Sequence, residues 1–306
     1  MSPPKVSTQV TIDGRRLSLS NLDKVLYPAV GFTKGQVIDY YARIAPVLVR
    51  HAAGRPMTLK RYPNGVQAKF FFEKNCPDHR PDFVDVAPVW SGHSKRNINF
   101  CLVNEVATAV WLANMAALEL HASLAVAPAV EAPTAVVFDL DPGPPAGLAE
   151  CCEVALAIRE LIGHLGLEAI VKTSGQKGMQ LYVPLNTATS YDETKPFALA
   201  VAQYMERQQP GLVVSNMAKE VRTGKVFIDW SQNDEHKTTV QAYSLRATDR
   251  PMVSAPISWE EVEAGRDDPD SLRFDSDAVL ARVENLGDLF APFVELTQEL
   301  PELQPT

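Results

Sequence analysis

Two aspartates lie inside an otherwise apolar run near the middle of this chain, and they constrain its fold more than any other feature. The run is Val136-Val137-Phe138-Asp139-Leu140-Asp141-Pro142-Gly143. Alternate residues of a strand face the same side, so Asp139 and Asp141 would point together, about 7 Å apart along the chain. Like charges buried side by side are unfavourable unless cations neutralise them. The pattern therefore predicts a buried strand, Thr134 to Asp141, whose acids hold divalent metal ions.

A surface turn at Asp-Pro-Gly is the alternative, but it accounts for Asp141 alone and leaves Asp139 within the strand. A third acid of the same kind is Asp229, near the end of the apolar run Val226-Phe227-Ile228-Asp229-Trp230. It would add a carboxylate ligand for hard, oxygen-preferring ions. Two such ions about 4 Å apart suit an in-line displacement at phosphorus. The three acids together favour chemistry at a phosphate.

A small polar turn follows the predicted strand that ends at Thr173. Its sequence is Thr173-Ser174-Gly175-Gln176-Lys177-Gly178. Backbone amides of such a turn can line a phosphate, while Lys177 adds charge and Ser174 adds a donor. A plain hairpin turn is the alternative. The acid pair elsewhere in the chain favours the phosphate-binding interpretation.

The remaining candidates carry a weaker signal. His121 ends a predicted helix, where a packing histidine is an equal alternative. Residues 60–74 interleave cations with the phenylalanines 70–72, a mixture that lets bases stack while phosphates are held. Three phenylalanines also suit a hydrophobic core. Lys24 and Lys34 would ordinarily lie on a solvated helix face.

Hydrophobic periodicity and turn residues predict a mixed α/β chain without internal repeats. We expect one domain over residues 1–306, in which 248–306 forms an acidic connector and a last helix packed on the rest. The predicted strands are a hairpin over 10–19 that turns at Asp13-Gly14, then 134–141, one ending at 173, 180–185 and 225–230. The predicted helices are 33–50, 102–121, 148–165, 193–208 and 276–284.

The net charge of −8 does not exclude a nucleic-acid partner, because the acidity is concentrated in one region. Residues 257–306 carry a net charge of −10, which leaves +2 for the rest of the chain. Local basic clusters decide phosphate binding, and they occur at 50–61, 93–96 and 222–225.

The cysteines and the chain start predict a cytoplasmic protein. Cys76, Cys101, Cys151 and Cys152 form no CxxC pair, so we expect four free, buried thiols and no disulfide. A zinc set built from Cys76, Asp78, His79, His93 and Cys101 matches no standard spacing. No stretch of 18 apolar residues suggests a membrane span, and the start, MSPPKVSTQV, lacks a leader pattern.

Taken in order, these motifs resemble the polymerase domain of bacterial ligase D, within the archaeo-eukaryotic primase superfamily. The resemblance implies a primase-polymerase catalytic core with RRM-like and strand-rich halves packed around the acids. The matching segments are Leu19–Pro28, Lys60–Gly65, Phe71–Lys74, Phe138–Gly143, Ser174–Gly178, Asp229–Asn233 and Tyr243–Arg246.

The resemblance also implies roles for individual residues. Asp139, Asp141 and Asp229 would be the ligands of two divalent ions, either Mn²⁺ or Mg²⁺. His121 would lie near the incoming nucleotide. Contacts to the triphosphate would come from Ser174, Lys177 and Lys60. Phe71 and Phe72 would stack on the base and the template. Further active-site positions are Gln180, Arg222, Gln232 and Arg246. A pocket for a DNA 5′-phosphate would use Asn21, Lys24 and Lys34.

Two positions depart from that family's pattern. The family turn continues to a histidine that reaches the phosphates, and here that position is Gln180, which cannot become cationic. No adenylation lysine for ligation is present, since Thr11 stands where a KxDG motif needs its lysine. We therefore expect polymerase activity without ligation, in either a free-standing polymerase or an excised domain.

The implied function is template-directed addition of ribonucleotides, and less readily deoxynucleotides, to a primer in gap or double-strand-break repair. The expected partners are gapped or broken DNA with a 5′-phosphate, NTPs and dNTPs, a separate ATP-dependent ligase and a Ku-type end-binding protein. We expect the protein to act at the nucleoid and not at a membrane. The residues alone would also suit a glycosyltransferase that uses Asp-x-Asp, or a non-catalytic DNA-end-binding module. Glycosyl transfer has no use for the basic and aromatic segment 60–74, and a scaffold gains nothing from clustered carboxylates.

Overall fold

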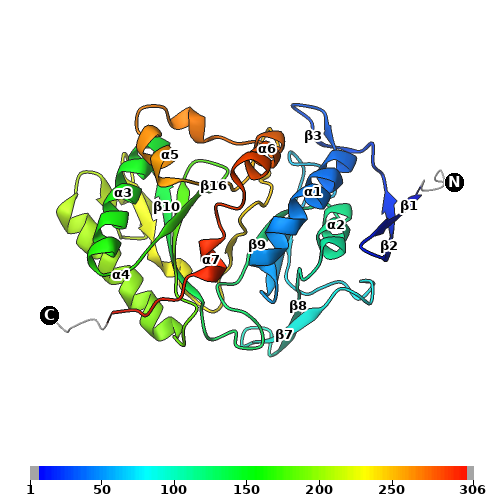
Figure 1. Cartoon of the computed structure of the whole chain (residues 1–306), viewed down its shortest axis with the longest axis horizontal. Helices are drawn as coiled ribbons and strands as arrows, with labels where there is room; N and C mark the ends of the chain where they lie inside the picture. The colour runs from blue at the N-terminus through cyan, green and yellow to red at the C-terminus, as the bar shows by residue number, and fades with distance from the viewer. Residues whose placement is uncertain (1–6, 302–306) are drawn as a thin grey trace.

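The computed structural model describes residues 7–301 and has two halves, each built on a six-stranded sheet, with the C-terminal helices between them (Figure 1). The first half holds a sheet of order β15-β9-β5-β8-β7, with β6 paired to β5. Its strands are β5 (Met57–Arg61), β6 (Phe71–Glu73), β7 (Val86–Ser91), β8 (Arg96–Cys101), β9 (Ala117–Ala122) and β15 (Thr239–Val240).

Helices α1 (Lys34–Ala52) and α2 (Val106–Asn114) cover this sheet, and two short antiparallel pairs flank it. These pairs are β1 (Ser7–Ile12) with β2 (Arg15–Ser20), and β3 (Val25–Tyr27) with β4 (Phe32–Thr33). α1 begins at a capping box, in which the Thr33 hydroxyl accepts from the Gln36 amide and the Gln36 side chain accepts from the Thr33 amide. The prediction of a hairpin and a following helix is confirmed.

The second half holds a sheet of order β13-β14-β10-β12-β11-β16, covered by α3 (Leu148–His164) and α4 (Tyr191–Gln208). Its strands are β10 (Ala135–Pro142), β11 (Ile170–Thr173), β12 (Met179–Pro184), β13 (Val213–Val214), β14 (Val226–Asp229) and β16 (Pro256–Ile257). Short 3-10 turns follow at η1 (Lys219–Val221) and η2 (Trp230–Gln232). The predicted strands and helices of this half are confirmed within a few residues at each end.

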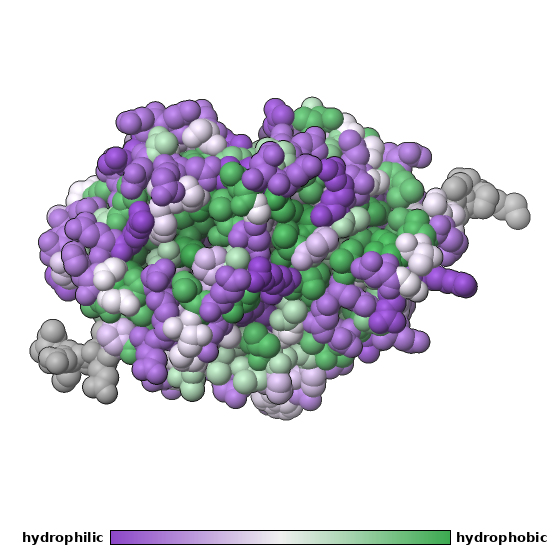
Figure 2. All heavy atoms as spheres, in the orientation of Figure 1, coloured by the Kyte–Doolittle hydropathy of each residue, from purple (hydrophilic) through white to green (hydrophobic). Residues whose placement is uncertain are grey.

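The C-terminal segment fills the seam between the halves. Phe290 and Phe293 stack at 4.9 Å, and each lies 5.5 Å from the Tyr182 ring of β12. The Arg55 guanidinium lies 4.7 Å over Phe293 from the other half. In the space-filling view hydrophobic residues show across the middle of this face, while hydrophilic residues dominate its upper edge (Figure 2). Apolar contacts through this segment therefore tie the two sheets together.

Three predicted elements were wrong in part. The predicted helix 102–121 is α2 followed by strand β9, so His121 lies on a strand between β5 and β15 and does not end a helix. The chain turns at Ala116, which adopts φ +56. The connector 248–275 contains β16, α5 (Trp259–Ala264) and η3 (Pro269–Leu272), and α6 (Ser276–Leu286) is followed by a further helix, α7 (Pro292–Glu295).

The cysteine prediction was also wrong for one pair. Cys76 and Cys101 form a disulfide, with their Cα atoms 5.1 Å apart. The Cys76 amide donates to the Asn99 carbonyl, so the segment after β6 runs alongside β8 and brings the two thiols together. Cys151 and Cys152 are free and buried, as expected. Among residues 7–301 no helix is long and apolar enough to cross a membrane.

Candidate active site

Neighbouring strands of the second sheet bring the predicted acids together. β10 is antiparallel to both β14 and β12, so Asp139 faces Asp229 on one side and Gln180 on the other. The even-numbered residues of β10 lie in the core under α3 and α4, so Asp139 and Asp141 lie on the opposite face. All four side chains line one polar cavity of about 320 Å³.

Asp139 is the most perturbed acid of this cavity. Burial and the neighbouring Asp229 carboxylate raise the pKa of Asp139 to about 6, although a hydrogen bond with Gln180 and the charge of Lys172 act in the opposite direction. A carboxylate pair in this state gains from any cation that binds between its members. A cation that binds at the end of β10 would therefore relieve the repulsion between Asp139 and Asp229.

Asp141 is already paired with cations of the chain. The Lys177 ammonium lies 2.9 Å from one of its oxygens, and the Arg222 guanidinium lies 3.5 Å from the other. Arg222 is held in turn by the Phe227 ring, whose centroid is 3.7 Å away, and by a hydrogen bond to the Met217 carbonyl. Lys177 and Arg222 thus lie at the mouth of the cavity on either side of this carboxylate.

Asp229 is oriented by the 3-10 turn η2 that follows it. One carboxylate oxygen accepts from the Ser231 amide and hydroxyl, at 3.0 and 2.5 Å, and the other accepts from Gln232 Nε2 at 2.8 Å. The turn is fixed by the buried side chain of Asn233, which pairs with both backbone groups of Val137 on β10. Gln232 therefore acts on the acid directly in this structure.

The carboxylates of Asp139, Asp141 and Asp229 are chemically suited to a hard divalent cation, but Asp141 and Asp229 are ion-paired or hydrogen-bonded to other side chains. No three His, Cys, Asp or Glu side chains of the described chain converge as a ready ligand set. Asp141 is turned to Lys177 and Asp229 to Ser231 and Gln232. Three carboxylates on adjacent strands around one polar cavity are nevertheless ligands of the type that Mg²⁺ and Mn²⁺ take.

The predicted phosphate turn closes on itself beside β10. The Ser174 hydroxyl accepts from the amides of Gly178 and Gln176, at 3.1 and 3.3 Å. Gly178 must lack a side chain because a Cβ there would collide with the Leu140 carbonyl. Gly175 has φ +71, and a Cβ there would lie 2.6 Å from Arg246. The glycines thus allow the turn to lie directly against the acid-bearing strand.

A buried acid that the sequence analysis did not single out, Glu119 on β9, gathers the cations of the other half. One of its oxygens lies 3.3 Å from Lys60 Nζ and accepts from the Ala247 amide, and the other lies 3.5 Å from Arg246 Nε. Arg246 also donates to the Ser174 carbonyl at 2.8 Å. Glu119 is therefore linked through Arg246 to the phosphate turn.

Glu119 also orients His121, two residues along the same strand. Burial alone would raise the pKa of Glu119, but the hydrogen bond from His121 and the charges of Arg246 and Lys60 lower it to about 2. His121 Nε2 lies 2.9 Å from the carboxylate and, since an ionised acid only accepts, carries the hydrogen. Burial lowers the pKa of His121 in spite of its acidic partner. A neutral histidine therefore presents its Nδ1 lone pair.

The predicted aromatic pair divides between two faces of β6. Phe72 pairs with Lys60 across β5 and β6, and Phe71 pairs with Arg61. Both rings are exposed, at 58% for Phe72 and 42% for Phe71. The Phe72 ring lies 6.5 Å from His121, whereas Phe71 lies over the Arg61 guanidinium. Phe72 is thus the ring on the side of Lys60 and His121.

Gln180 belongs to a buried polar network behind Asp139. Its side-chain oxygen accepts from Lys172 Nζ at 2.6 Å and from the Tyr182 hydroxyl at 3.1 Å. Lys172 is fully buried, donates also to Ser254 Oγ at 2.6 Å, and has its pKa lowered well below the ordinary value by burial. With its oxygen occupied, Gln180 presents its amide hydrogens towards Asp139.

The three residues predicted for a 5′-phosphate lie together before and at the start of α1. Lys24 Nζ is exposed and donates to Asn64 at 2.9 Å, and the Lys24 amide donates to the Asn21 carbonyl. Lys34 is not on a solvated face: it is 5% exposed, and its Nζ donates to the Ser20 carbonyl at 2.6 Å. Asn21, Lys24 and Lys34 thus surround one short turn.

Comparison with known proteins places this arrangement in a family. The family described as "LigD, primase-polymerase domain" matches residues 33–290. The chain is 43% identical over 279 residues to the multifunctional non-homologous end joining protein LigD of Mycolicibacterium smegmatis, and 30% identical over 287 residues to the bifunctional LigD of Bacillus subtilis. These matches cover 90% and 94% of this chain, but only 36% and 45% of the relatives.

A solved structure resembles the whole fold. The polymerase domain from Mycobacterium tuberculosis ligase D, solved in complex with DNA, superimposes with a TM-score of 0.84 at 41% identity. The match covers 91% of this chain and 98% of that domain. The expected mixed α/β architecture is confirmed.

Proposed function

The chain belongs to the LigD primase-polymerase family, and from this premise we propose that it is a template-dependent nucleotidyltransferase in DNA gap or double-strand-break repair. It would add ribonucleotides or deoxyribonucleotides to the 3′-hydroxyl of a primer. The observation that carries this proposal is the cavity at the end of β10, where three carboxylates meet the cationic rim of Lys177 and Arg222.

The proposed metal ligands are Asp139, Asp141 and Asp229, for two Mn²⁺ or Mg²⁺ ions. Such ions, when bound, supply Lewis-acid activation of the attacking oxygen and neutralise the charge on the transferring phosphoryl group. The repulsion between Asp139 and Asp229 favours cation binding, and Lys177 must leave Asp141 to make that oxygen available. Ser231 and Gln232 orient Asp229 by donating to both its oxygens.

The nucleotide would lie between the two halves of the molecule. The Ser174 turn, with Lys177 released from Asp141, is proposed to hold the triphosphate, and Arg246 anchors the turn. Lys60 and neutral His121 do not line the acid cavity, but Glu119 and Arg246 connect them to it. His121 Nδ1 would accept a hydrogen bond from a sugar hydroxyl there. Phe72 offers an exposed ring for base stacking on that side.

The proposed partners follow from this chemistry. They are DNA with a gap or break and a 5′-phosphate, NTPs and dNTPs, and, because the relatives are end-joining proteins, a DNA ligase and a Ku-type end-binding protein. The DNA substrate implies action at the nucleoid.

A primer-extension assay tests the proposal. A gapped duplex with a 5′-phosphate is incubated with the protein and Mn²⁺, with NTPs and dNTPs supplied separately. We expect extension with both and more with NTPs, and none from Asp139→Ala. Binding to the duplex without any extension by the wild type would instead support an end-binding module.

A further inference from the structure

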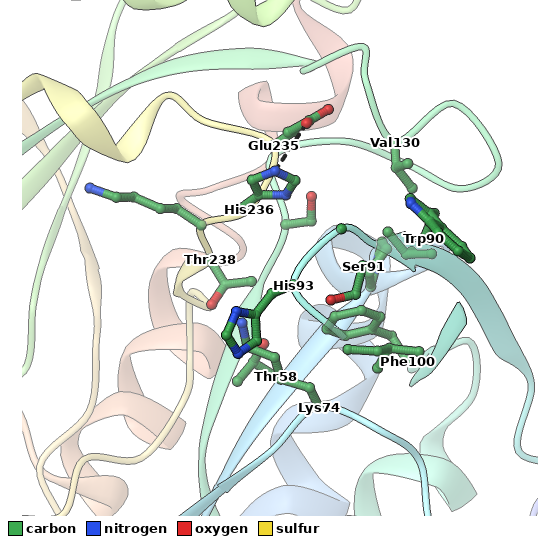
Figure 3. A pocket seen from close by; sticks show the side chains of 16 residues that line it. Thr58, Lys74, Trp90, Ser91, His93, Phe100, Val130, Glu235, His236 and Thr238 are labelled. Carbon is green, nitrogen blue, oxygen red and sulfur yellow. Dashed lines mark ion pairs between the residues drawn. The ribbon is translucent and has the colours of Figure 1, made fainter. Parts of the chain in front are cut away.

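A second cavity, of about 310 Å³, lies away from the acids, between the β7–β8 hairpin and the loop that precedes β15. The hairpin contributes Trp90 and Phe100, β5 contributes Thr58, and the loop contributes Lys237 and Thr238. In the close-up, Trp90 stands beside Val130 on one side, while His93, Lys74 and Thr58 lie on the other (Figure 3). None of the proposed catalytic residues lines this cavity.

The walls of this cavity are apolar and aromatic. Val89 pairs with Ile98 across the hairpin, and both line the cavity together with Phe100. Trp90 at the edge is 63% exposed, which leaves most of its ring accessible. A flat aromatic platform beside apolar walls is the surface on which an unstacked nucleobase binds, whatever its identity.

The rim carries positive charge. Lys74 and Lys237 line the cavity, and neither makes an ion pair with an acid of the described chain. The one acid among the described lining residues, Glu235, lies 3.2 Å from His236, which also lines the cavity. A cationic rim above an aromatic platform complements a nucleotide unit, with its phosphate outside and its base within.

The cavity continues the face of the proposed nucleotide site. Thr58 faces His121 across β5 and β9, and Lys60, two residues along β5, lies on the same side of the sheet. Lys74 comes two residues after Phe72, just past the end of the adjoining strand β6. A single strand that leaves Phe72 would therefore pass Lys74 and reach the cavity next.

We propose that this cavity binds the base of one unpaired nucleotide of the single-stranded template, held on Trp90 with its phosphate near Lys74. The inference rests on the proposed function for the identity of the strand, but its geometry does not involve the acids. It assigns the β7–β8 hairpin a contact with the unpaired template beyond the site of nucleotide addition, whatever the base.

The test is binding of a primer–template with a short single-stranded template extension, measured by fluorescence anisotropy without metal or free nucleotide. One abasic site is moved along the extension, one position at a time. We expect a single position at which loss of the base weakens binding by about tenfold, in line with the stacking of one base. Trp90→Ala should lose the same factor on intact DNA and show no further loss at that position.

Two further variants make the result specific. Tyr204→Ala removes an exposed aromatic ring on α4 and should bind like the wild type. Lys74→Ala should weaken binding to every extension, with a shallower salt dependence, and it covers the case in which Trp90→Ala does not fold.

Equal losses at every abasic position, or unchanged affinity of folded Trp90→Ala, would overturn the proposal while leaving primer extension intact. Tryptophan fluorescence that free NTP quenches in the wild type but not in Trp90→Ala would also overturn it, because the cavity would then be a mononucleotide site. If the wild type fails to extend a primer but still loses affinity at a single abasic position, the result counts against the polymerase proposal and not against this cavity.

Discussion

At the scale of single residues, the proposed metal site depends on carboxylates at alternate positions of buried strands. That spacing was sufficient to predict Asp139 and Asp141 from the sequence, because few other arrangements explain two acids in an apolar run. The same spacing occurs at Glu119 and His121, yet it was not recognised, because residues two apart do not share a face of the helix predicted there. The signal was present in Leu118-Glu119-Leu120-His121.

Asp139→Asn should abolish primer extension and stabilise the metal-free protein. The pKa of Asp139 is about 6 in the folded chain against 3.8 ordinarily, so ionisation above that pH acts against folding, and an amide carries no charge. The gain in unfolding free energy should be about 1–3 kcal/mol at neutral pH, shrink as the pH falls through about 6, and vanish near about pH 4.

Urea unfolding at several pH values measures this gain, and Mn²⁺ provides the control. The ion should raise the unfolding midpoint of the wild type and leave that of Asp139→Asn unchanged. A gain that does not vary with pH would show that burial of the charge is not its cause.

Glu119→Gln should destabilise the protein strongly, because it leaves Lys60 and Arg246 without their buried partner. Loss of one member of a buried ion pair costs about 3–5 kcal/mol. The pKa of Glu119 is lowered to about 2, so its stabilisation is complete above the ordinary value near 4.5 and is lost as the pH falls below that towards 2. Denaturant midpoints at neutral pH and near about pH 3, inside the range between the two pKa values, check both the size and the direction. A near-neutral effect at pH 7 would refute the role of Glu119 in gathering these cations.

At the scale of elements, the sequence predicted strands and helices wherever a turn residue separates them. Asp13-Gly14, Pro142-Gly143 and the 174–178 turn each marked a boundary. The boundary between α2 and β9 has no glycine or proline. The chain reverses there at Met115 and Ala116, within an apolar run. Pairing with β5 and β15, which are distant in sequence, decides that segment. Local periodicity cannot detect such a partner.

The Cys76–Cys101 disulfide is another non-local pairing. It links the segment after the Phe71–Phe72 strand to β8, across 25 residues of sequence. Closing a loop of this length in the unfolded chain stabilises the fold by about 3 kcal/mol. Cys76→Ser should therefore lower the unfolding midpoint, and a reductant should do the same to the wild type. Cys152→Ser, at a free buried thiol, is the control: it keeps the disulfide, so a reductant should still lower its midpoint, whereas the midpoint of Cys76→Ser should not change with reductant. Four titratable thiols in the denatured, unreduced protein would disprove the pairing.

The start of α1 should act as a clamp for a DNA 5′-phosphate. Its first two amides are already bonded to the Lys24 and Leu22 carbonyls, so the charge must come from lysine side chains. We expect a gapped duplex with a 5′-phosphate to bind about tenfold more tightly than the same duplex with a 5′-hydroxyl, since charge-assisted bonds are worth about 1.5–3 kcal/mol.

Lys24→Ala should reduce that difference without affecting extension of an unphosphorylated primer, because Lys24 is exposed and lies away from the acids. Arg43→Ala, at an exposed position of the same helix, should preserve it. Anisotropy titrations at one fixed salt concentration compare the proteins. Equal binding of the two duplexes by the wild type would remove the clamp.

At the scale of the whole molecule, the proposed nucleotide site depends on the way the two sheets meet. The acids come from β10 and β14, whereas Lys60 and His121 come from the other sheet, and the C-terminal aromatics hold the seam. The sequence indicated both sets of residues, but nothing local predicts that the halves face each other. Only the family resemblance carried that expectation. Arg246, bonded to Glu119 on one side and to the Ser174 turn on the other, is the residue that joins the two sites.

The most direct test of the central claim is templated incorporation in a single turnover. A primer–template with each of the four template bases is given each nucleotide separately, with Mn²⁺, by wild-type protein and by Asp229→Asn. We expect that the nucleotide added by the wild type follows the template base, and that Asp229→Asn binds the same DNA but adds none. Incorporation that ignores the template base, or that survives in Asp229→Asn, would contradict it.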